Sequence, residues 1–253
     1  MSVVATIPAG YAPRADLLKD RVILITGAGA GLGRVTALAC AKAGATVILL
    51  GRTVKKLEAV FDEIEAAGGP QPAIYPMNLL GTTWADIFEL SETIEREFGR
   101  LDGLVHCAAH FAGFTPISEE KPKDWLDGLQ VNLTAAMAIT RHCLPLLQQA
   151  PDASIVFVTD AVGRDPKPLR GGYGVAKYAL EGLVKGWSQE LSVSPNLRMN
   201  TYDPGPMQTD LRAKGFLAEE VQKLPFATVA VPGLLYLLGP DSVGVTGQAW
   251  SRD

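Results

Sequence analysis

Along this chain, short apolar runs alternate with longer segments in which apolar residues recur every three or four positions. The short runs are rich in valine, isoleucine and leucine, which is typical of strands covered on both faces, whereas the longer spacing is typical of amphipathic helices. Strands that alternate with helices predict βαβ units and therefore a parallel sheet. The predicted strands are residues 21–26, 45–50, 73–76, 101–108, 154–159, 197–202 and 247–250.

The predicted helices fill the spaces between these strands. Glycines follow the first two helical patterns and mark their ends, because glycine readily takes the left-handed conformation beyond a helix C-terminus. Pro145 falls inside the longest pattern and predicts a bend or a break there. The first helix is expected to end near residue 43, and the others to cover residues 54–67, 83–98, 123–149, 172–193 and 231–238.

These elements predict one α/β domain over residues 1–253, a Rossmann-type doubly wound sheet of seven parallel strands flanked by helices. Chains of roughly 250 residues often remain a single domain in this class. Residues 1–15 are expected to form a flexible N-terminal arm, and residues 204–230, which lack a regular pattern, a mobile cover over a pocket. In such a sheet, ligands bind beyond the carboxyl ends of the strands.

Composition and charge exclude several classes of function. The net charge of −4 provides no basic field for a nucleic-acid backbone, so nucleic acid is not an expected partner. No apolar run approaches the ~20 residues of a membrane span, and residues 1–13 lack the pattern of a signal peptide. The three cysteines have no disulfide or zinc spacing. We therefore expect a cytoplasmic protein that binds neither metal nor membrane.

A glycine-rich segment, TGAGAGLG, lies between the first predicted strand and the first predicted helix. Glycines at this junction allow a tight turn and a close approach of the backbone to a pyrophosphate, which meets the positive end of the helix dipole. A merely flexible turn is the alternative. The strand–loop–helix context favours a dinucleotide site, and its expected residues are Gly27, Gly29, Ala30, Gly31, Leu32 and Gly33.

Arg52 follows the second predicted strand, at the position where an acidic residue would accept hydrogen bonds from an adenosine ribose. A carboxylate there would repel a 2′-phosphate, whereas a guanidinium binds phosphate through its fork of donors. We therefore expect NADP(H) to be favoured over NAD(H).

Tyr173 and Lys177 stand four residues apart in a predicted helix and so share one helix face. An ammonium group beside the phenol favours the phenolate and would lower its pKa from ~10 towards neutrality. Such a tyrosine can act as a general acid and base. A YxxxK spacing alone occurs in many helices, but its position after the fifth predicted strand favours the catalytic interpretation.

Together, the glycine loop, Asn132, Tyr173, Lys177 and the segment Asp203-Pro204-Gly205 resemble the short-chain dehydrogenase/reductase superfamily in order and spacing. Strings such as RVILITGA and TVILLGR look closest to its YciK-like bacterial oxidoreductases. The resemblance implies interconversion of a carbonyl and a secondary alcohol in a small-molecule substrate, by a homodimer or homotetramer.

In that family, the tyrosine is the general acid/base and the lysine orients the nicotinamide ribose and lowers the tyrosine pKa. The asparagine helps to position a water molecule in a proton relay. These roles carry over to Tyr173, Lys177 and Asn132, although Asn132 has an alternative interpretation as a helix-interior amide bonded to neighbouring backbone. The resemblance also implies cofactor contacts from Asn78, Leu79, Ala108, Pro204, Gly205, Met207 and Thr209.

Asp160 stands thirteen residues before Tyr173, where the family normally has a serine that hydrogen-bonds the substrate oxygen. A protonated Asp160 can donate a hydrogen bond in place of that serine, so activity would survive. An ionised Asp160, paired with Arg164 or Lys177, would repel a developing alkoxide and raise the Tyr173 pKa. The second case predicts a different class of protein, a catalytically impaired NADP(H)-binding sensor or interaction subunit.

Overall fold

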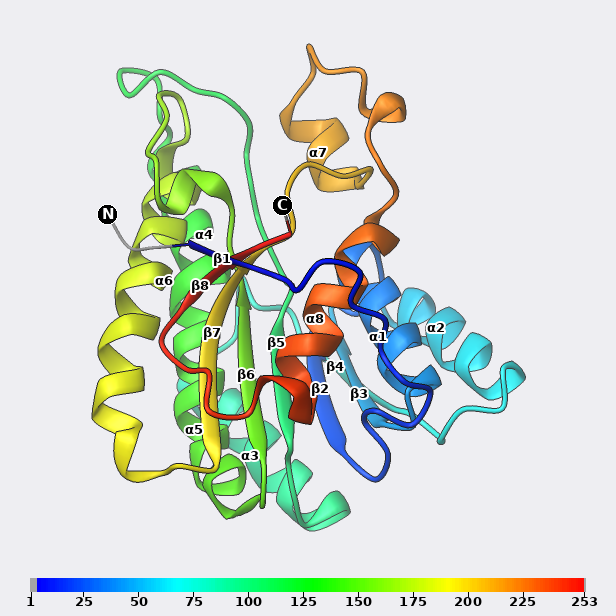
Figure 1. Cartoon of the computed structure of the whole chain (residues 1–253). Helices are drawn as coiled ribbons and strands as arrows, with labels where there is room; N and C mark the ends of the chain where they lie inside the picture. The colour runs from blue at the N-terminus through cyan, green and yellow to red at the C-terminus, as the bar shows by residue number, and fades with distance from the viewer. Residues whose placement is uncertain (1–3, 253) are drawn as a thin grey trace.

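A computed structural model describes residues 4–252 as a parallel sheet between two layers of helices (Figure 1). The strands are β1 (Val4–Thr6), β2 (Val22–Thr26), β3 (Thr46–Gly51), β4 (Ala73–Pro76), β5 (Gly103–His106), β6 (Ala153–Val158), β7 (Leu197–Asp203) and β8 (Ala249–Ser251). Their order across the sheet is β1-β8-β7-β6-β5-β2-β3-β4, and each neighbouring pair is parallel. The predicted Rossmann-type α/β fold is therefore confirmed.

The sheet has eight strands instead of the predicted seven. The additional strand, β1, belongs to the segment expected to be a flexible arm, of which residues 1–3 lie outside the described residues. Val4 pairs with Ala249 of β8, so backbone hydrogen bonds along the edge of β8 hold this strand. A strand of three residues without an apolar run carries no periodic signal, which is why the sequence pattern did not predict it.

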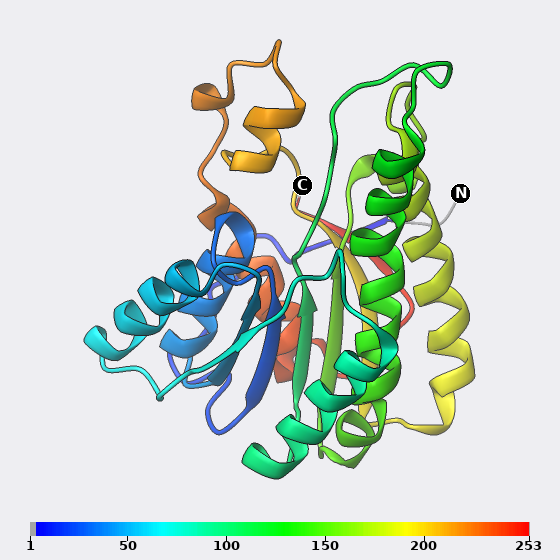
Figure 2. The same ribbon diagram turned by 180° about the vertical axis from the view of Figure 1, so that it is seen from behind.

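Helices cover both faces of the sheet (Figures 1 and 2). Ile23 and Ile25 belong to the core shared with α1, α2 and α8, whereas Leu24 belongs to the core shared with α3, α5 and α6. This alternation follows from the period of two in a strand. The helices are α1 (Gly31–Lys42), α2 (Val54–Ala66), α3 (Trp84–Phe98), α4 (Pro122–Leu129), α5 (Ala135–Gln149), α6 (Gly171–Glu190), α7 (Asp210–Gly215) and α8 (Val231–Leu238).

The long helix predicted over residues 123–149 is interrupted, but not at Pro145, which lies inside α5. A π-helical turn over Gln130–Thr134 separates α4 from α5. Within that turn, the Asn132 side chain donates to the Gly128 carbonyl oxygen at 2.7 Å. A side chain that takes a helix carbonyl competes with the regular backbone ladder. The interruption therefore coincides with a predicted site residue, as π-turns often do.

The segment after β7, predicted to be an irregular cover, contains α7 and two short 3₁₀ turns, Val221–Lys223 and Ala227–Ala230. The Thr209 hydroxyl caps α7 by accepting from the Arg212 backbone N–H at 3.1 Å. Figures 1 and 2 show this segment beyond the carboxyl ends of the strands, on the same side of the molecule as the loop that follows β5. Both segments therefore border the edge where ligands bind in such sheets.

Candidate active site

A cleft of about 570 Å³ opens at the carboxyl edge of the sheet. Its volume lies within the range of ordinary ligand sites. The structure brings almost every predicted site residue to its walls. These residues are Gly27, Gly29, Ala30, Gly31, Leu32, Gly33, Arg52, Asn78, Leu79, Ala108, Asp160, Tyr173, Lys177, Pro204, Gly205, Met207 and Thr209.

The glycine loop leaves no room for side chains at two of its positions. Gly27 has φ +70°, and a Cβ there would lie 2.9 Å from the Ala108 Cα. At Gly33 a methyl group would overlap the Gly27 carbonyl oxygen. The Thr26 hydroxyl accepts a hydrogen bond from the Ala108 N–H at 3.1 Å, which ties the loop to the end of β5. The exposed backbone that results fits a pyrophosphate at the start of α1.

Arg52 lines the cleft just beyond the end of β3, whereas Tyr173 and Lys177 line it from α6. No carboxylate within the described residues forms an ion pair with it. Lys56 of α2 lines the same part of the wall. Two cations without an anionic partner fit a phosphate group on an adenosine ribose.

Lys177 is buried, with 3% of its surface exposed, and its Nζ donates to the Val158 carbonyl oxygen at 2.7 Å. The same Nζ lies 5.6 Å from the centre of the Tyr173 ring, so the two side chains do share a face of α6. Burial lowers the pKa of Lys177 to about 8, against an opposing effect of the nearby Asp160.

Tyr173 donates a hydrogen bond to Asp160 Oδ2 at 3.0 Å. Burial raises the pKa of Tyr173 well above its usual range, and Asp160 raises it further by its charge and by this hydrogen bond. The predicted lowering of this pKa by Lys177 is therefore wrong for the chain without a cofactor, because desolvation and a neighbouring carboxylate dominate. Only Arg170, which the sequence analysis did not consider, acts noticeably in the other direction.

Asp160 does not pair with Arg164, which was one of its two predicted partners. Its Oδ1 accepts from the Val162 N–H at 2.9 Å and caps the 3₁₀ turn Ala161–Gly163. Arg164 instead donates to Asp203 Oδ2 at 2.8 Å. Both oxygens of Asp160 thus accept hydrogen bonds within the cleft, one from a backbone N–H and one from the Tyr173 hydroxyl.

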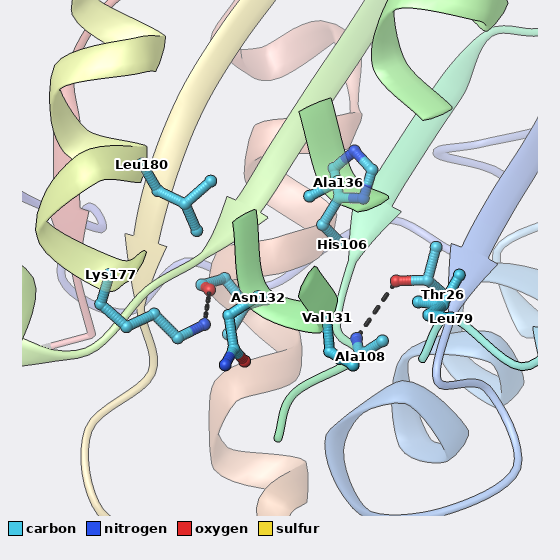
Figure 3. Close-up of a pocket in the computed structure, with 10 residues that line it drawn as sticks. Thr26, Leu79, His106, Ala108, Val131, Asn132, Ala136, Lys177 and Leu180 are labelled. Carbon is cyan, nitrogen blue, oxygen red and sulfur yellow. Dashed lines mark hydrogen bonds between the residues drawn. The ribbon is translucent and has the colours of Figure 1, made fainter. Parts of the chain in front are cut away.

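Asn132 lies behind the cleft, beside a small cavity of about 10 Å³ that Lys177 and His106 also line (Figure 3). Its side chain donates to the His110 carbonyl oxygen at 2.7 Å and accepts from the His110 N–H at 3.0 Å. The bond to Gly128 is the one expected of an amide inside a helix, whereas the two bonds to His110 join the π-turn to the loop after β5. A cavity of this size, with the side chains of Thr26, His106, Asn132 and Lys177 in its wall, has room for roughly one water molecule.

Asp203 is the last residue of β7 and precedes Pro204 and Gly205. Its Oδ1 accepts from the Gly205 N–H at 2.9 Å, and its other oxygen accepts from Arg164. Glu181 lies 3.6 Å from the same guanidinium. The charge of Asp203 is thus compensated by an arginine, so the carboxylate can hold the turn as an amide oxygen would.

Three residues near one end of the cleft were not predicted from the sequence, Phe111, Phe114 and Arg170, and they meet Phe216 of the segment predicted to be a cover. The three rings lie within 6 Å of one another, although they come from the loop after β5 and from the cover. The Phe111 ring lies 4.9 Å from the Tyr173 ring. Two phenylalanines, Phe111 and Phe114, stand in the loop after a predicted strand, and they were the signal that the sequence offered. Their contact with Arg170 depends on the tertiary structure.

Among residues 4–252, no group of three or more His, Cys, Asp or Glu side chains is arranged to hold a metal ion. Within the same residues, no helix combines the length and apolar character that crossing a membrane requires.

Comparison with protein families identifies a relationship over most of the chain. The family described as short chain dehydrogenase matches residues 21–220. The uncharacterized oxidoreductase YciK of Escherichia coli K12 is 39% identical over 240 residues, which cover 95% of this chain and 94% of that protein. The 3-oxoacyl-[acyl-carrier-protein] reductase FabG of Thermotoga maritima is 31% identical over 249 residues, which cover 93% of this chain and 97% of its own.

Solved structures agree with this relationship. A short chain dehydrogenase from Escherichia coli CFT073, solved with NADPH, superposes with a TM-score of 0.92 at 38% identity and covers 95% of this chain and 100% of its own. One from Shigella flexneri 2a, solved with NADP, has a TM-score of 0.91 at 38% identity and covers 94% of this chain and 99% of its own.

Proposed function

The chain belongs to the short chain dehydrogenase family and is an oxidoreductase of that family; we propose that it interconverts a carbonyl and a secondary alcohol with NADP(H) as its cofactor. The observation that carries the proposal is the position of Tyr173 and Lys177 in one cleft with the glycine loop and Arg52. Two relatives solved with NADP or NADPH support the choice of cofactor.

The proposed reaction gives separate roles to the cofactor and to several residues of the cleft. The bound nicotinamide supplies or accepts the hydride. Tyr173 gives a proton to the carbonyl oxygen during reduction and takes it back during oxidation. Lys177 holds a positive charge beside that phenol and stabilises its ionised form. Asn132 and Lys177 line the cavity in which one water molecule can continue the proton path, while Phe111 and Phe216 exclude bulk water from the substrate end.

Asp160 is the group that decides how efficient this chemistry is. In its acid form it donates a hydrogen bond to the substrate oxygen, as the family's serine does. In its ionised form it holds the Tyr173 proton through the 3.0 Å hydrogen bond and opposes negative charge on the substrate. That hydrogen bond favours a second candidate function, an NADP(H)-binding sensor or interaction subunit with little turnover.

Replacing Asp160 by serine separates the two functions. If Asp160 is ionised, Asp160→Ser should raise kcat for ketone reduction by about 100-fold, the usual effect of one hydrogen-bond donor at a developing oxyanion. In the direction of alcohol oxidation, the rise of rate with pH should move to lower pH, because the carboxylate that raises the Tyr173 pKa is gone. The measurement is the absorbance of the reduced nicotinamide with a panel of ketones and quinones.

The outcomes of this experiment are distinct. Turnover in the parent protein supports the enzyme, and turnover that Asp160→Ser leaves unchanged assigns the donor role to the acid form of Asp160, because the serine hydroxyl supplies the same donor. Binding of NADPH without turnover in the parent, restored by serine, supports the sensor. An absence of turnover in both proteins with every substrate contradicts the proposed reaction.

Substitution of Arg52 tests the proposed preference for NADPH over NADH. Arg52→Gln should weaken NADPH binding by about 10- to 100-fold, because it removes a charge-assisted contact to the 2′-phosphate, and should leave NADH binding within about twofold. Lys55→Gln is the matched control, since Lys55 is exposed on the same segment but does not line the cleft. Tighter binding of NADH than of NADPH to the parent protein would contradict the proposed preference. Isothermal titration calorimetry measures the dissociation constants of NADPH and NADH for the parent and for both variants.

We further propose a homodimer or homotetramer in the reducing cytoplasm. Exposed apolar side chains on neighbouring faces of α4 and α6 support an interface there: Trp125, Leu126, Val175 and Tyr178 are between 36% and 61% exposed. Trp187 of α6 is half-buried and packs against the core of the chain. Cys40 and Cys143 are buried free thiols, which suits a reducing compartment.

A further inference from the structure

Arg170 precedes α6 and stands three residues before Tyr173. Its guanidinium carbon lies 4.2 Å from the centre of the Phe114 ring, 4.8 Å from that of Phe216 and 6.0 Å from that of Phe111. Aromatic faces attract a cation but cannot accept its hydrogen bonds as an anion does. The surroundings of this guanidinium are therefore attractive but do not satisfy its hydrogen-bonding groups.

Two of the Arg170 donors, Nε and Nη1, are buried and have no hydrogen-bond partner. Within residues 4–252, no carboxylate lies within ion-pair distance of this guanidinium. A buried donor without an acceptor is costly, so native structures rarely keep one without a role. The unmet requirement is for an acceptor, and a carboxylate satisfies two such donors at once.

Arg212 shows what a completed arrangement looks like in the same cluster. Its guanidinium carbon lies 3.4 Å from the centre of the Phe216 ring, and its Nη2 donates to Glu219 Oε1 at 2.8 Å. The chain thus supplies a carboxylate to one arginine on this ring and none to the other. Because Arg212 has a carboxylate partner and Arg170 has none within the described part of the chain, Arg170 is the guanidinium of this cluster that can bind a ligand.

The anion that Arg170 lacks is not Asp160. That carboxylate is engaged by the Val162 N–H and the Tyr173 hydroxyl, and it does not reach the guanidinium as an ion pair. It acts on Arg170 only through its charge, as does Tyr173. Arg170 is therefore close to Tyr173 and Asp160, while its Nε and Nη1 donors remain without an acceptor among the residues that the structure describes.

The position of Arg170 also separates it from the proposed cofactor groups. Its charge acts on Tyr173, at the reacting end of the cleft, whereas the glycine loop and Arg52 lie where the pyrophosphate and ribose phosphate would bind. Phe111 and Phe216, which contact Arg170, line the substrate end. An anion at Arg170 would therefore belong to the substrate, and its uncharged portion would meet aromatic side chains.

We propose that Arg170 binds the carboxylate of the substrate, and that this substrate is an apolar or aromatic oxo acid. The inference rests on the proposed function and names the substrate class of the same site. The carbonyl carbon gains a hydride from NADPH, its oxygen gains a proton from Tyr173, and the products are the hydroxy acid and NADP⁺. The carboxylate takes no part in the reaction and serves to hold the substrate against the rings.

The test compares two aromatic oxo acids of different length, benzoylformate and 4-oxo-4-phenylbutanoate, with their methyl esters. Arg170→Gln should lower kcat/KM for the acids by about 10- to 100-fold, mainly through KM, and change that for the esters by less than about twofold. Arg170→Lys, which keeps the charge and loses the fork, should fall between the parent and Arg170→Gln. The melting temperature of each variant shows that it is folded.

Arg212→Gln is the matched control, because it removes the other guanidinium from Phe216 and should alter acids and esters to the same extent. An equal loss for acids and esters in Arg170→Gln would overturn the inference. The inference would also be overturned if the kcat/KM for the acids, divided by that for the esters, were the same in Arg170→Gln as in the parent protein.

A second readout does not require turnover. Binding of mandelate, a hydroxy acid product, to the protein saturated with NADP⁺ should weaken by about tenfold in Arg170→Gln, as measured by calorimetry. If no ketone is reduced but this difference appears, the proposed reaction fails and the carboxylate site stands. If mandelate binds equally to both proteins, the carboxylate site fails even when reduction is observed.

Discussion

Replacing Tyr173 by phenylalanine should reduce kcat for carbonyl reduction by about 100- to 10,000-fold, the usual contribution of a positioned general acid. The hydroxyl is the part of Tyr173 that carries the proton, and the ring itself packs against Phe111. The substitution therefore leaves the wall of the cleft in place. NADPH affinity should change by less than about threefold, because the proposed phosphate contacts lie elsewhere in the cleft.

Tyr178→Phe provides the control for this substitution. Tyr178 is on the same helix and is 58% exposed, so the same change at that position should leave kcat unaltered. Steady-state kinetics with a saturating ketone gives kcat, and titration with NADPH gives the affinity for the cofactor. Undiminished reduction by Tyr173→Phe would remove the general acid from the proposed mechanism.

Replacing Gly33 by alanine should weaken NADPH binding by about 5- to 150-fold and lower the free energy of unfolding by about 1–3 kcal/mol. The new methyl group would overlap the Gly27 carbonyl oxygen, which is backbone and cannot turn away as a flexible side chain can. The loop must shift to accommodate it. The N–H groups at the start of α1 then no longer face the pyrophosphate as they do in the native loop.

Gly182→Ala is the matched change, since Gly182 is also helical but has no atom within 4 Å of an added methyl group. This variant should bind NADPH normally and gain up to about 1 kcal/mol in stability, because alanine is the better helix former. Chemical denaturation and calorimetry measure the two effects. Equal behaviour of the two variants would show that the close contact at Gly33 is not what shapes the loop.

Features that depend on residues close together in the chain could be predicted from the sequence. The glycine loop was found because its residues are contiguous and lie between an apolar strand and a helix. Tyr173 and Lys177 were found because a separation of four residues places two side chains on one helix face. The parallel sheet followed from the alternation of apolar runs with helical patterns, and the structure confirms it.

The electrostatic state of the catalytic pair could not be predicted in the same way. From spacing alone, Lys177 should lower the Tyr173 pKa, yet burial and Asp160 raise it in the folded chain. Burial depends on everything that packs around a side chain, and Asp160 reaches Tyr173 from a different element. The sequence shows that Asp160 stands thirteen residues before Tyr173, but it does not show which group each carboxylate oxygen of Asp160 binds.

By itself, the sequence determined the alternation of strands and helices from β2 to β8, the glycine-rich loop between β2 and α1 and the shared helix face of Tyr173 and Lys177, because each of these depends on periodicity or on close spacing. The tertiary structure alone decided that β1 adds to the edge at β8, that a π-turn carries Asn132, that Arg164 binds Asp203, and that three phenylalanines from two distant segments surround Arg170. These contacts join residues far apart in the chain, and packing of the whole fold brings such residues together.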